Sequence, residues 1–283
     1  MKLAIVQTKP RKGEFAGNLA ELGTVFAQLA SEPPDLVVLP EAALTGYFLE
    51  GAVYDLALDA PAMARRLAAT WRAASDAPVD LVAGFYENDG GTFYNSAVYL
   101  SVAADGEPIV HVHRKMFLPT YGVFDEHRFV SRGRFLRTFE TRFGRMAILI
   151  CEDMWHAIAP TIAAIHGARF LIVPSASPGR GLAGKGDLES IEHWNHVMAL
   201  HAIEHGVYVI YAGLAGFEGG KGMTGSSCVV DPSGTQIVAA PALGACIVRA
   251  DLDSAEIDRA RSRLPLIGDL RAVLPDLVAE LER

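Results

Sequence analysis

The stretch "RMAILICED", residues 145–153, decides how this chain is expected to fold. Its centre is continuously apolar, which is typical of a strand that is buried on both faces of a sheet. Strand-like runs recur along the chain, and helical patterns lie between some of them. The further runs are 2–8, 35–41, 80–87, 94–100, 108–115, 169–177, 207–213, 226–231 and 245–252.

Four segments carry helical signals. Asn18 precedes the first and is a residue type that favours the N-cap position. Pro61 opens the second, and Gly206 follows the third, where a glycine suits the C-cap. The fourth is a short amphipathic segment at the C-terminus. The segments are 19–30, 61–74, 194–205 and 274–283.

Two turn signals, at residues 89–91 and 231–234, predict β-hairpins in the middle and late parts of the chain. Earlier in the chain, strands and helices alternate. This mixture favours a layered α/β sandwich with antiparallel hairpins over an all-parallel doubly wound sheet. No repeat, low-complexity tract or linker divides the sequence, so we expect a single domain over residues 1–283.

Composition and cysteine spacing exclude several classes of protein. The net charge of −8, with scattered Lys and Arg, argues against a nucleic-acid-binding surface. No apolar run approaches the length of a membrane span, and the apolar start of the chain is too short for a signal peptide. Cys151, Cys228 and Cys246 form no CxxC motif, which indicates free thiols in a reducing, cytoplasmic compartment.

The stretch "PSASPGRGLAGKGD", residues 174–187, contains a GxxxxGK pattern that ends at Lys185 and is close to a phosphate-binding loop. A true loop of that type has Ser or Thr next, to contact Mg²⁺, and this chain has Gly186. We therefore interpret the stretch as a loop over a pocket rather than as a phosphate-binding loop. An uninvolved surface loop is the alternative.

Three reactive side chains stand where strand-like runs end. Glu41 ends the run 35–41, Lys115 ends the run 108–115, and Cys151 follows the apolar centre of the opening stretch. Strand ends commonly position catalytic groups, so the three could converge at one edge of a sheet. Taken singly, each has a structural alternative, namely a core thiol, a surface carboxylate and a solvated lysine.

A metal enzyme is the rival interpretation of the same region. Cys151, Glu152, Asp153, His156 and His166 are close together in the sequence. Their spacing matches no zinc motif, since the chain has neither HExxH nor a paired CxxC. We therefore expect no metal and no cofactor.

The contexts of the three reactive residues carry a family resemblance. They are "DLVVLPEAALTGY" (35–47), "HRKMFLPTYGVFDEHRF" (113–129) and "AILICEDMWH" (147–156). Together they resemble the nitrilase, or carbon–nitrogen hydrolase, superfamily, whose members carry a Glu-Lys-Cys triad in this order. The resemblance covers most of the chain and implies a four-layer α-β-β-α sandwich of the nitrilase type. The second motif, with "CEDMW" and "SASP", is similar to the glutaminase domain of glutamine-dependent NAD synthetase.

The resemblance implies a cysteine-dependent amidohydrolase that cleaves a non-peptide C–N bond of a primary amide. Cys151 would be the nucleophile, Glu41 the general base, and Lys115 the group that stabilises the oxyanion. Glu126 would hold the lysine and the substrate. A loop carboxylate paired with Arg128 is the alternative for Glu126.

The same resemblance assigns three weaker roles around the substrate. Tyr121 would line the pocket, Glu152 would contact the amino group of the substrate, and Ser177 would contact its acyl side. A purely structural role is the alternative for each. Trp155 is expected to pack in the core, and Gly179 departs from the glutaminase pattern, which has a bulky residue there.

Several functions stay open at this point. The enzyme could be a free-standing amidase, a stand-alone glutaminase subunit that supplies ammonia to a separate NAD synthetase-like partner, or an N-carbamoyl amide hydrolase. A non-enzymatic binding module on the same fold is the alternative from another class. The resemblance also implies a homodimer or higher homo-oligomer, and the apolar segment 264–278 would pack on a partner chain or on its own core.

Overall fold

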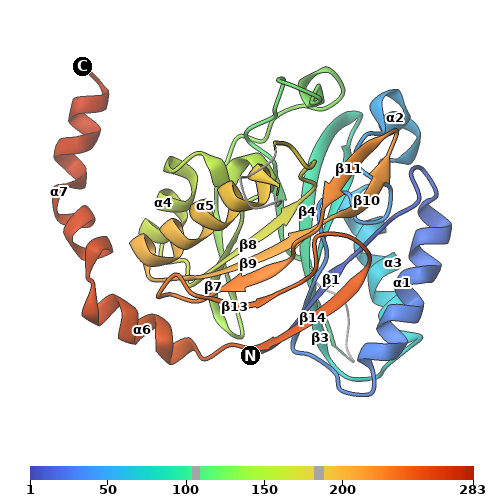
Figure 1. Cartoon of the computed structure of the whole chain (residues 1–283), viewed down its shortest axis with the longest axis horizontal. Helices are drawn as coiled ribbons and strands as arrows, with labels where there is room; N and C mark the ends of the chain where they lie inside the picture. The colour runs from blue at the N-terminus through green and yellow to red at the C-terminus, as the bar shows by residue number, and fades with distance from the viewer. Residues whose placement is uncertain (104–108, 182–187) are drawn as a thin grey trace.

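Two six-stranded sheets form the centre of the molecule in a computed structural model that describes residues 1–103, 109–181 and 188–283 (Figure 1). The first sheet has the order β14 (Cys246–Asp251), β1 (Lys2–Gln7), β2 (Leu36–Val38), β3 (Val79–Asp89), β4 (Thr92–Val102) and β5 (Ile109–Arg114). The second has the order β13 (Gln236–Ala239), β12 (Cys228–Val230), β9 (Tyr208–Gly213), β8 (Phe170–Ser175), β7 (Gly144–Ile148) and β6 (Thr138–Thr141). Both sheets are mixed, since parallel pairs at the centre are flanked by antiparallel ones.

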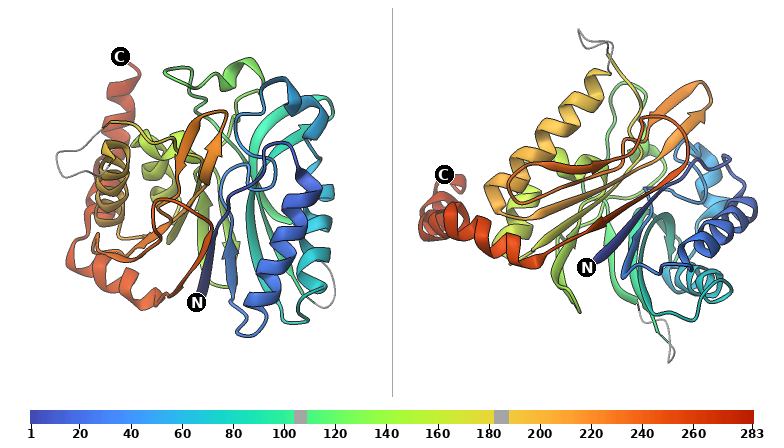
Figure 2. Two further views of the ribbon diagram at one scale, coloured as in Figure 1. Left: turned by 45° about the vertical axis from the view of Figure 1, so that its right-hand side comes forward. Right: turned by 60° about the horizontal axis from the view of Figure 1, so that its bottom comes forward.

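The sheets pack face to face, and helices cover their outer faces (Figure 2). α1 (Phe15–Leu29) and α3 (Ala60–Arg72) cover the first sheet, and α4 (Ile158–Ile165) and α5 (Glu189–His205) cover the second. Apolar side chains of both sheets, such as Ile5 and Ile148, share one fully buried core. Burial of one such side chain stabilises the fold by about 1.5–3 kcal/mol. The four-layer α-β-β-α sandwich of the nitrilase type is therefore confirmed.

The helix termini confirm one predicted cap and correct another. α5 ends at Gly206, whose φ of 55° is in the left-handed region that favours glycine. Asn18, in contrast, lies inside α1 and does not cap it. Its side-chain amide donates hydrogen bonds to the carbonyls of Arg11 (2.8 Å) and Leu44 (2.9 Å), so it joins the helix to the loop that follows Glu41.

Both predicted turns connect hairpins. β3 and β4 pair in antiparallel register across Gly90 and Gly91, and β12 pairs with β13 across the turn that ends at Gly234. A further hairpin is formed by β10 (Ala215–Glu218) and β11 (Lys221–Thr224).

The C-terminal helices lie at the periphery of the molecule (Figure 1). α6 (Ser254–Arg263) leads to α7 (Leu266–Leu281), which is longer than the predicted segment 274–283. Large apolar side chains of α7, among them Val273, Leu277 and Leu281, are exposed, so this part of the helix does not pack on its own core. Within the three described ranges, no helix is both long and apolar enough to cross a bilayer.

Candidate active site

The four predicted catalytic side chains come from turns at the ends of strands. Glu41 follows β2 and Lys115 follows β5 directly. Cys151 begins η3 (Cys151–Trp155), a short 3₁₀ helix after β7, and Glu126 begins η2 (Glu126–Arg128). The exposed fraction of each is 6% or less, so Glu41 is not a surface carboxylate and Lys115 is not a solvated lysine.

The Lys115 ammonium lies between two carboxylates. Its Nζ is 2.8 Å from Oε1 of Glu41 and 2.5 Å from Oε1 of Glu126. The Tyr47 hydroxyl donates a further hydrogen bond to the same Glu126 oxygen. A fully buried charge requires partners of this kind, because burial removes its hydration. Arg128 instead faces Asp125 at 3.8 Å on the exposed surface, so the alternative pairing for Glu126 is wrong.

Hydrogen bonds fix the Glu41 carboxylate from two further directions. Its Oε1 accepts a bond from Asn95 Nδ2 at 2.7 Å, and its Oε2 accepts one from the backbone N–H of Ala176, also at 2.7 Å. Gly84 of β3 packs directly behind it, and a Cβ at this position would lie 2.5 Å from Glu41 Cα. A glycine is therefore required for this close approach.

Cys151 has a strained backbone, with a φ of 47° in a region that side-chain-bearing residues rarely adopt. Asp153 supports the turn, since its carboxylate accepts bonds from the N–H groups of Ile150, Met116 and Phe117, each at 3.0 Å. The same carboxylate pairs with His113 Nε2 at 2.8 Å. Asp153 thus joins the turn that carries Cys151 to the end of the strand that carries Lys115.

Burial and charge shift the pKa values of the cluster. Burial and the Glu41 carboxylate raise the pKa of the Cys151 thiol, while Lys115 opposes them. Burial lowers the pKa of Lys115, but Glu126 and Glu41 outweigh it, and the result is well above the ordinary value. Burial raises the pKa of Glu126 to about 7, with Lys115 opposing it and Glu41 adding to it. The lysine is therefore charged and the thiol protonated near neutral pH.

A cavity of about 290 Å³ leads to Cys151. All three predicted substrate-binding residues line it, and the Tyr121 hydroxyl donates to Glu152 Oε2 at 2.8 Å. The Ser177 hydroxyl accepts a bond from Trp194 Nε1 at 3.0 Å. Trp155 also lines the cavity and is 37% exposed, so the prediction of a core tryptophan is wrong. Its ring packs edge-on against Trp194.

The wall of the cavity also contains charged residues that the sequence motifs did not identify. The Arg180 guanidinium lies over the rings of Phe124 (5.5 Å) and Tyr121 (5.8 Å). Glu189, at the start of α5, lines the same cavity. The cavity therefore presents a cation and two carboxylates, counting Glu152, around an aromatic wall.

The described part of the loop 174–187 is paired with the hairpin beside it. Pro178 forms a β-bridge with Met223, and the Gly179 N–H donates to the Gly222 carbonyl at 2.8 Å. A Cβ at position 179 would lie 2.8 Å from Leu188 Cδ1, which explains why a bulky residue is absent there. Lys185 and Gly186 of the GxxxxGK pattern lie outside the described residues.

The predicted rival metal set is not brought together as a cluster. In the part of the chain that the structure describes, the group of side chains spaced to hold a metal ion is His201, Glu204 and His205. All three belong to α5, and none was among the predicted ligands.

Sequence reasoning missed several residues that contact the predicted ones. Asn95, Tyr47 and Asp153 bond to Glu41, Glu126 and the turns around the thiol. Asn95 had a weak signal, because it is a polar residue that directly precedes the largely apolar part of β4. Arg180 had none, since it lies in a loop without periodicity.

The comparisons with known proteins agree with this geometry. Residues 2–262 match the carbon-nitrogen hydrolase family, and the chain belongs to that family. It is 29% identical to a citrullinase of Francisella tularensis subsp. tularensis, over 100% of this chain and 98% of that protein. It is 30% identical to a glutamine-dependent NAD(+) synthetase of Rhodobacter capsulatus, over 98% of this chain but only 46% of the synthetase.

A solved structure shows the same fold over the full length. The crystal structure of a carbon-nitrogen hydrolase from Helicobacter pylori G27 matches with a TM-score of 0.85 at 25% identity. The match covers 100% of this chain and 98% of that one. The protein is therefore a carbon–nitrogen hydrolase with amidohydrolase activity in the general sense of the family.

Proposed function

We propose that this enzyme cleaves the terminal carboxamide or ureido group of a small amino-acid-like molecule through an acyl group on Cys151, which is a thioester from a carboxamide and a thiocarbamate from a ureido group. The observation that carries the proposal is the buried Lys115 ammonium between Glu41 and Glu126, next to a thiol at the base of a cavity. The arrangement supplies a nucleophile, a base and an oxyanion partner, which are the three groups that acyl transfer requires.

In the first half of the reaction, the Cys151 sulfur bonds to the carbonyl carbon while Glu41 takes the thiol proton. The carbonyl electron pair moves to oxygen, and Lys115 and the backbone N–H of Glu152 stabilise this oxyanion. When the oxyanion collapses, the C–N bond breaks, Glu41 gives its proton to the leaving nitrogen, and ammonia departs. A buried, protonated thiol is consistent with this order, because proton loss then accompanies the attack.

In the second half, water attacks the thioester carbon and Glu41 takes one of its protons. The C–S bond breaks, the proton returns to sulfur, and the acid is released. Glu126 does not exchange protons in this scheme. It holds Lys115 in place through the 2.5 Å contact and contributes to the electrostatics of the cluster.

The charges on the cavity wall support an amino-acid headgroup. Arg180 would pair with an α-carboxylate, and Glu152 with Glu189 would accept an α-ammonium. A plain aliphatic amide offers no charge to these three groups, which would keep only contacts such as those of Tyr121 with Glu152 and of His193 with Glu189. The similar citrullinase, whose name denotes a ureido amino acid as substrate, supports the N-carbamoyl reading.

A second candidate is a glutaminase subunit that supplies ammonia to a separate NAD synthetase-like partner. The similarity to 46% of the synthetase of Rhodobacter capsulatus favours it, since this chain spans less than half of that protein. This candidate requires that glutamine hydrolysis be slow alone and faster when the partner is added.

Ammonia release from the purified protein tests these readings. The substrates are citrulline, glutamine, asparagine, N-carbamoyl amino acids and short aliphatic amides, with Cys151→Ala as the control. Cys151-dependent release that is faster from the amino-acid substrates supports the proposal. Release from aliphatic amides alone contradicts the headgroup assignment, and release that survives in Cys151→Ala contradicts the mechanism.

We further propose a cytoplasmic homo-oligomer. Three free cysteines support a reducing compartment, and the exposed apolar side chains of α7 support contact with a second copy. The single domain over residues 1–283 stays a prediction.

A further inference from the structure

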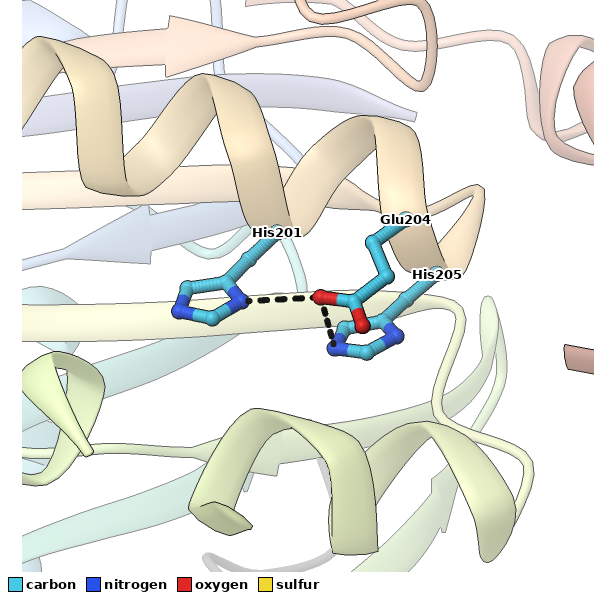
Figure 3. Close-up of side chains that lie close together, drawn as sticks. All are labelled: His201, Glu204 and His205. Atoms are coloured by element: carbon cyan, nitrogen blue, oxygen red, sulfur yellow. Dashed lines mark ion pairs between the residues drawn. The ribbon is translucent and has the colours of Figure 1, made fainter. Parts of the chain in front are cut away.

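The second half of α5 carries a cluster that takes no part in the proposed reaction. His201, Glu204 and His205 extend from one face of the helix toward one another (Figure 3). The spacing of three and four residues places all of them on the same side. Glu204 Oε2 is 3.7 Å from His201 Nδ1 and 3.7 Å from His205 Nε2.

These distances are too long for hydrogen bonds and close to those between the ligands of one ion. An N–H···O bond would bring the atoms to about 2.9 Å. Tetrahedral Zn²⁺, at about 2.0–2.1 Å from each ligand, would place neighbouring ligand atoms about 3.3 Å apart. Small side-chain rotations would therefore close the cluster around an ion.

The buried imidazoles supply a second, independent observation. His201 is 3% exposed and His205 is fully buried, and His201 Nδ1 has no hydrogen-bond partner although it points toward Glu204. A buried polar atom without a partner is unfavourable, and a bound ion would satisfy it.

The outer contacts of His201 resemble those of a metal ligand. Its ring makes a hydrogen bond with the backbone of Met154. Nδ1, which has no hydrogen-bond partner, is the ring nitrogen that lies toward Glu204. A bond from the second ring nitrogen to a backbone carbonyl is the usual way in which proteins orient a histidine ligand.

The surroundings admit an ion. Glu204 is 42% exposed, so the cluster opens to solvent on its side. His205 Nε2 shares a long hydrogen bond of 3.5 Å with Thr161 Oγ1 of α4, which an ion would replace. Arg261 is the cation near His205, and its guanidinium already donates to the carbonyls of Ala168, His205 and Gly206. Its charge weakens binding of a cation without occupying the ligand atoms.

We propose that His201, Glu204 and His205 bind one divalent transition-metal ion of the Zn²⁺ class, with a fourth position open to water. Two imidazoles and one carboxylate form the nitrogen and oxygen ligand set that zinc prefers. The ion would lie between α4 and α5 and would contact the chain directly behind η3, which carries Cys151. We assign it a structural role, since the cluster is outside the cavity that leads to the thiol.

Zinc titration of the chelator-treated full-length protein tests the site. Zn²⁺ retained after gel filtration is measured by elemental analysis, with Cys151 alkylated so that its thiol does not bind the ion. We expect one Zn²⁺ per chain, a higher unfolding temperature with Zn²⁺, and at least a tenfold loss of affinity in Glu204→Gln. Glu192→Gln, an exposed glutamate on the same helix, is the matched control and should retain full affinity.

Co²⁺ provides the second measurement, because it reports the ligands directly. We expect visible bands of low-coordinate Co²⁺ that are lost in Glu204→Gln and in His201→Gln, and no thiolate charge-transfer band. Failure to retain Zn²⁺, equal affinity in Glu204→Gln and the parent, or a thiolate band at one equivalent would each overturn the proposal. Because the readouts are binding and spectra, the result does not depend on the proposed hydrolysis.

Discussion

Lys115 Nζ lies 2.5 Å from Glu126 Oε1 and only slightly farther, 2.8 Å, from Glu41 Oε1, so one buried ammonium serves two carboxylates. With both carboxylates ionised, the cluster carries a net negative charge that burial disfavours. The affinity for a proton belongs to the whole cluster, and Glu126 is the group that mainly takes the proton. Burial raises the pKa of Glu126 to about 7.

Glu126→Gln should lower kcat about 10²-fold, because Lys115 loses the charge that orients it toward the oxyanion. In the parent enzyme, kcat should rise with pH through about 7 as Glu126 loses its proton, and the variant should lack this rise. The measurement is a pH–rate profile of ammonia release. Asp125→Asn, an exposed neighbour, is the control, and an unchanged profile in Glu126→Gln would contradict the assignment.

The same group predicts a pH dependence of stability. Because the pKa of Glu126 is raised above 4.5 on folding, the folded protein retains a proton that the unfolded chain loses first. The contribution of Glu126 to the free energy of unfolding is therefore highest below about pH 4.5, decreases up to about 7 and is level above that. Urea titrations at several pH values should show a smaller decrease over this window in Glu126→Gln than in the parent.

The Cys151 thiol should react slowly with iodoacetamide at neutral pH, and faster as the pH rises. Burial and the charge of Glu41 raise its pKa, so only a small fraction is thiolate before substrate binds. Alkylation is followed by mass spectrometry of the peptide that contains Cys151. A rate that is already constant between pH 6 and 8 would indicate a preformed thiolate and would argue against proton transfer during the attack.

Arg180→Gln should raise KM about 10–100-fold for substrates with an α-carboxylate, as expected for the loss of one charged hydrogen bond. Its kcat, and KM for a short aliphatic amide, should change little, because Arg180 lies on the cavity wall and not at the thiol. Arg132→Gln, in a separate pocket, is the control. Equal effects on both substrate classes would indicate a structural role for Arg180.

Asp153→Ala should lower the free energy of unfolding by about 3 kcal/mol or more, because it leaves several buried hydrogen-bonding groups without their partner. The substitution leaves His113 without its partner and frees three backbone N–H groups near the thiol. Asp125→Ala, at the surface, should change stability by less than about 0.5 kcal/mol. Urea denaturation of both variants makes the comparison.

Lysine substitutions in α7 should reduce the oligomer size if this helix contacts a second copy. Leu277→Lys with Leu281→Lys adds charge to the exposed apolar side chains, and burial of such charges in an interface is unfavourable. Light scattering gives the mass of each form. Glu280→Gln, on the same helix, is the control, and an unchanged mass in the double variant would place the interface elsewhere.

The sequence was sufficient for the layers of the fold and for the residues around the thiol. Long apolar runs predicted the strands. Glu41, Lys115 and Cys151 stand at the ends of three of these runs, and the structure brings them together with Glu126. Local sequence patterns gave wrong predictions at positions where tertiary contacts decide the role of the residue. Asn18 has the chemistry of a cap, but bonds to Leu44 place it inside α1.

Two other features could not be derived from local sequence. Trp155 is apolar and follows a buried segment, yet it lines the cavity because η3 turns it toward Trp194. The cluster of His201, Glu204 and His205 on α5 has the order HxxEH, which differs from the HExxH and CxxC patterns that indicate zinc sites in a sequence. The proposal of a metal site depends on the burial of the two histidines and on a ring nitrogen without a hydrogen-bond partner. Neither can be derived from the sequence.

The Asp153 carboxylate receives hydrogen bonds from the turns on both sides of the reaction centre. These two turns therefore behave as one rigid part, and a substitution that displaces either would misalign both the sulfur and the ammonium. Among the described residues, Arg180 and Glu189 of the cavity wall are outside this hydrogen-bond network of Asp153, although Arg180 packs on Tyr121, whose hydroxyl bonds to Glu152. Exchange of wall residues could thus give new substrate preferences on an unchanged chemical centre, which makes this wall the place to redesign the enzyme.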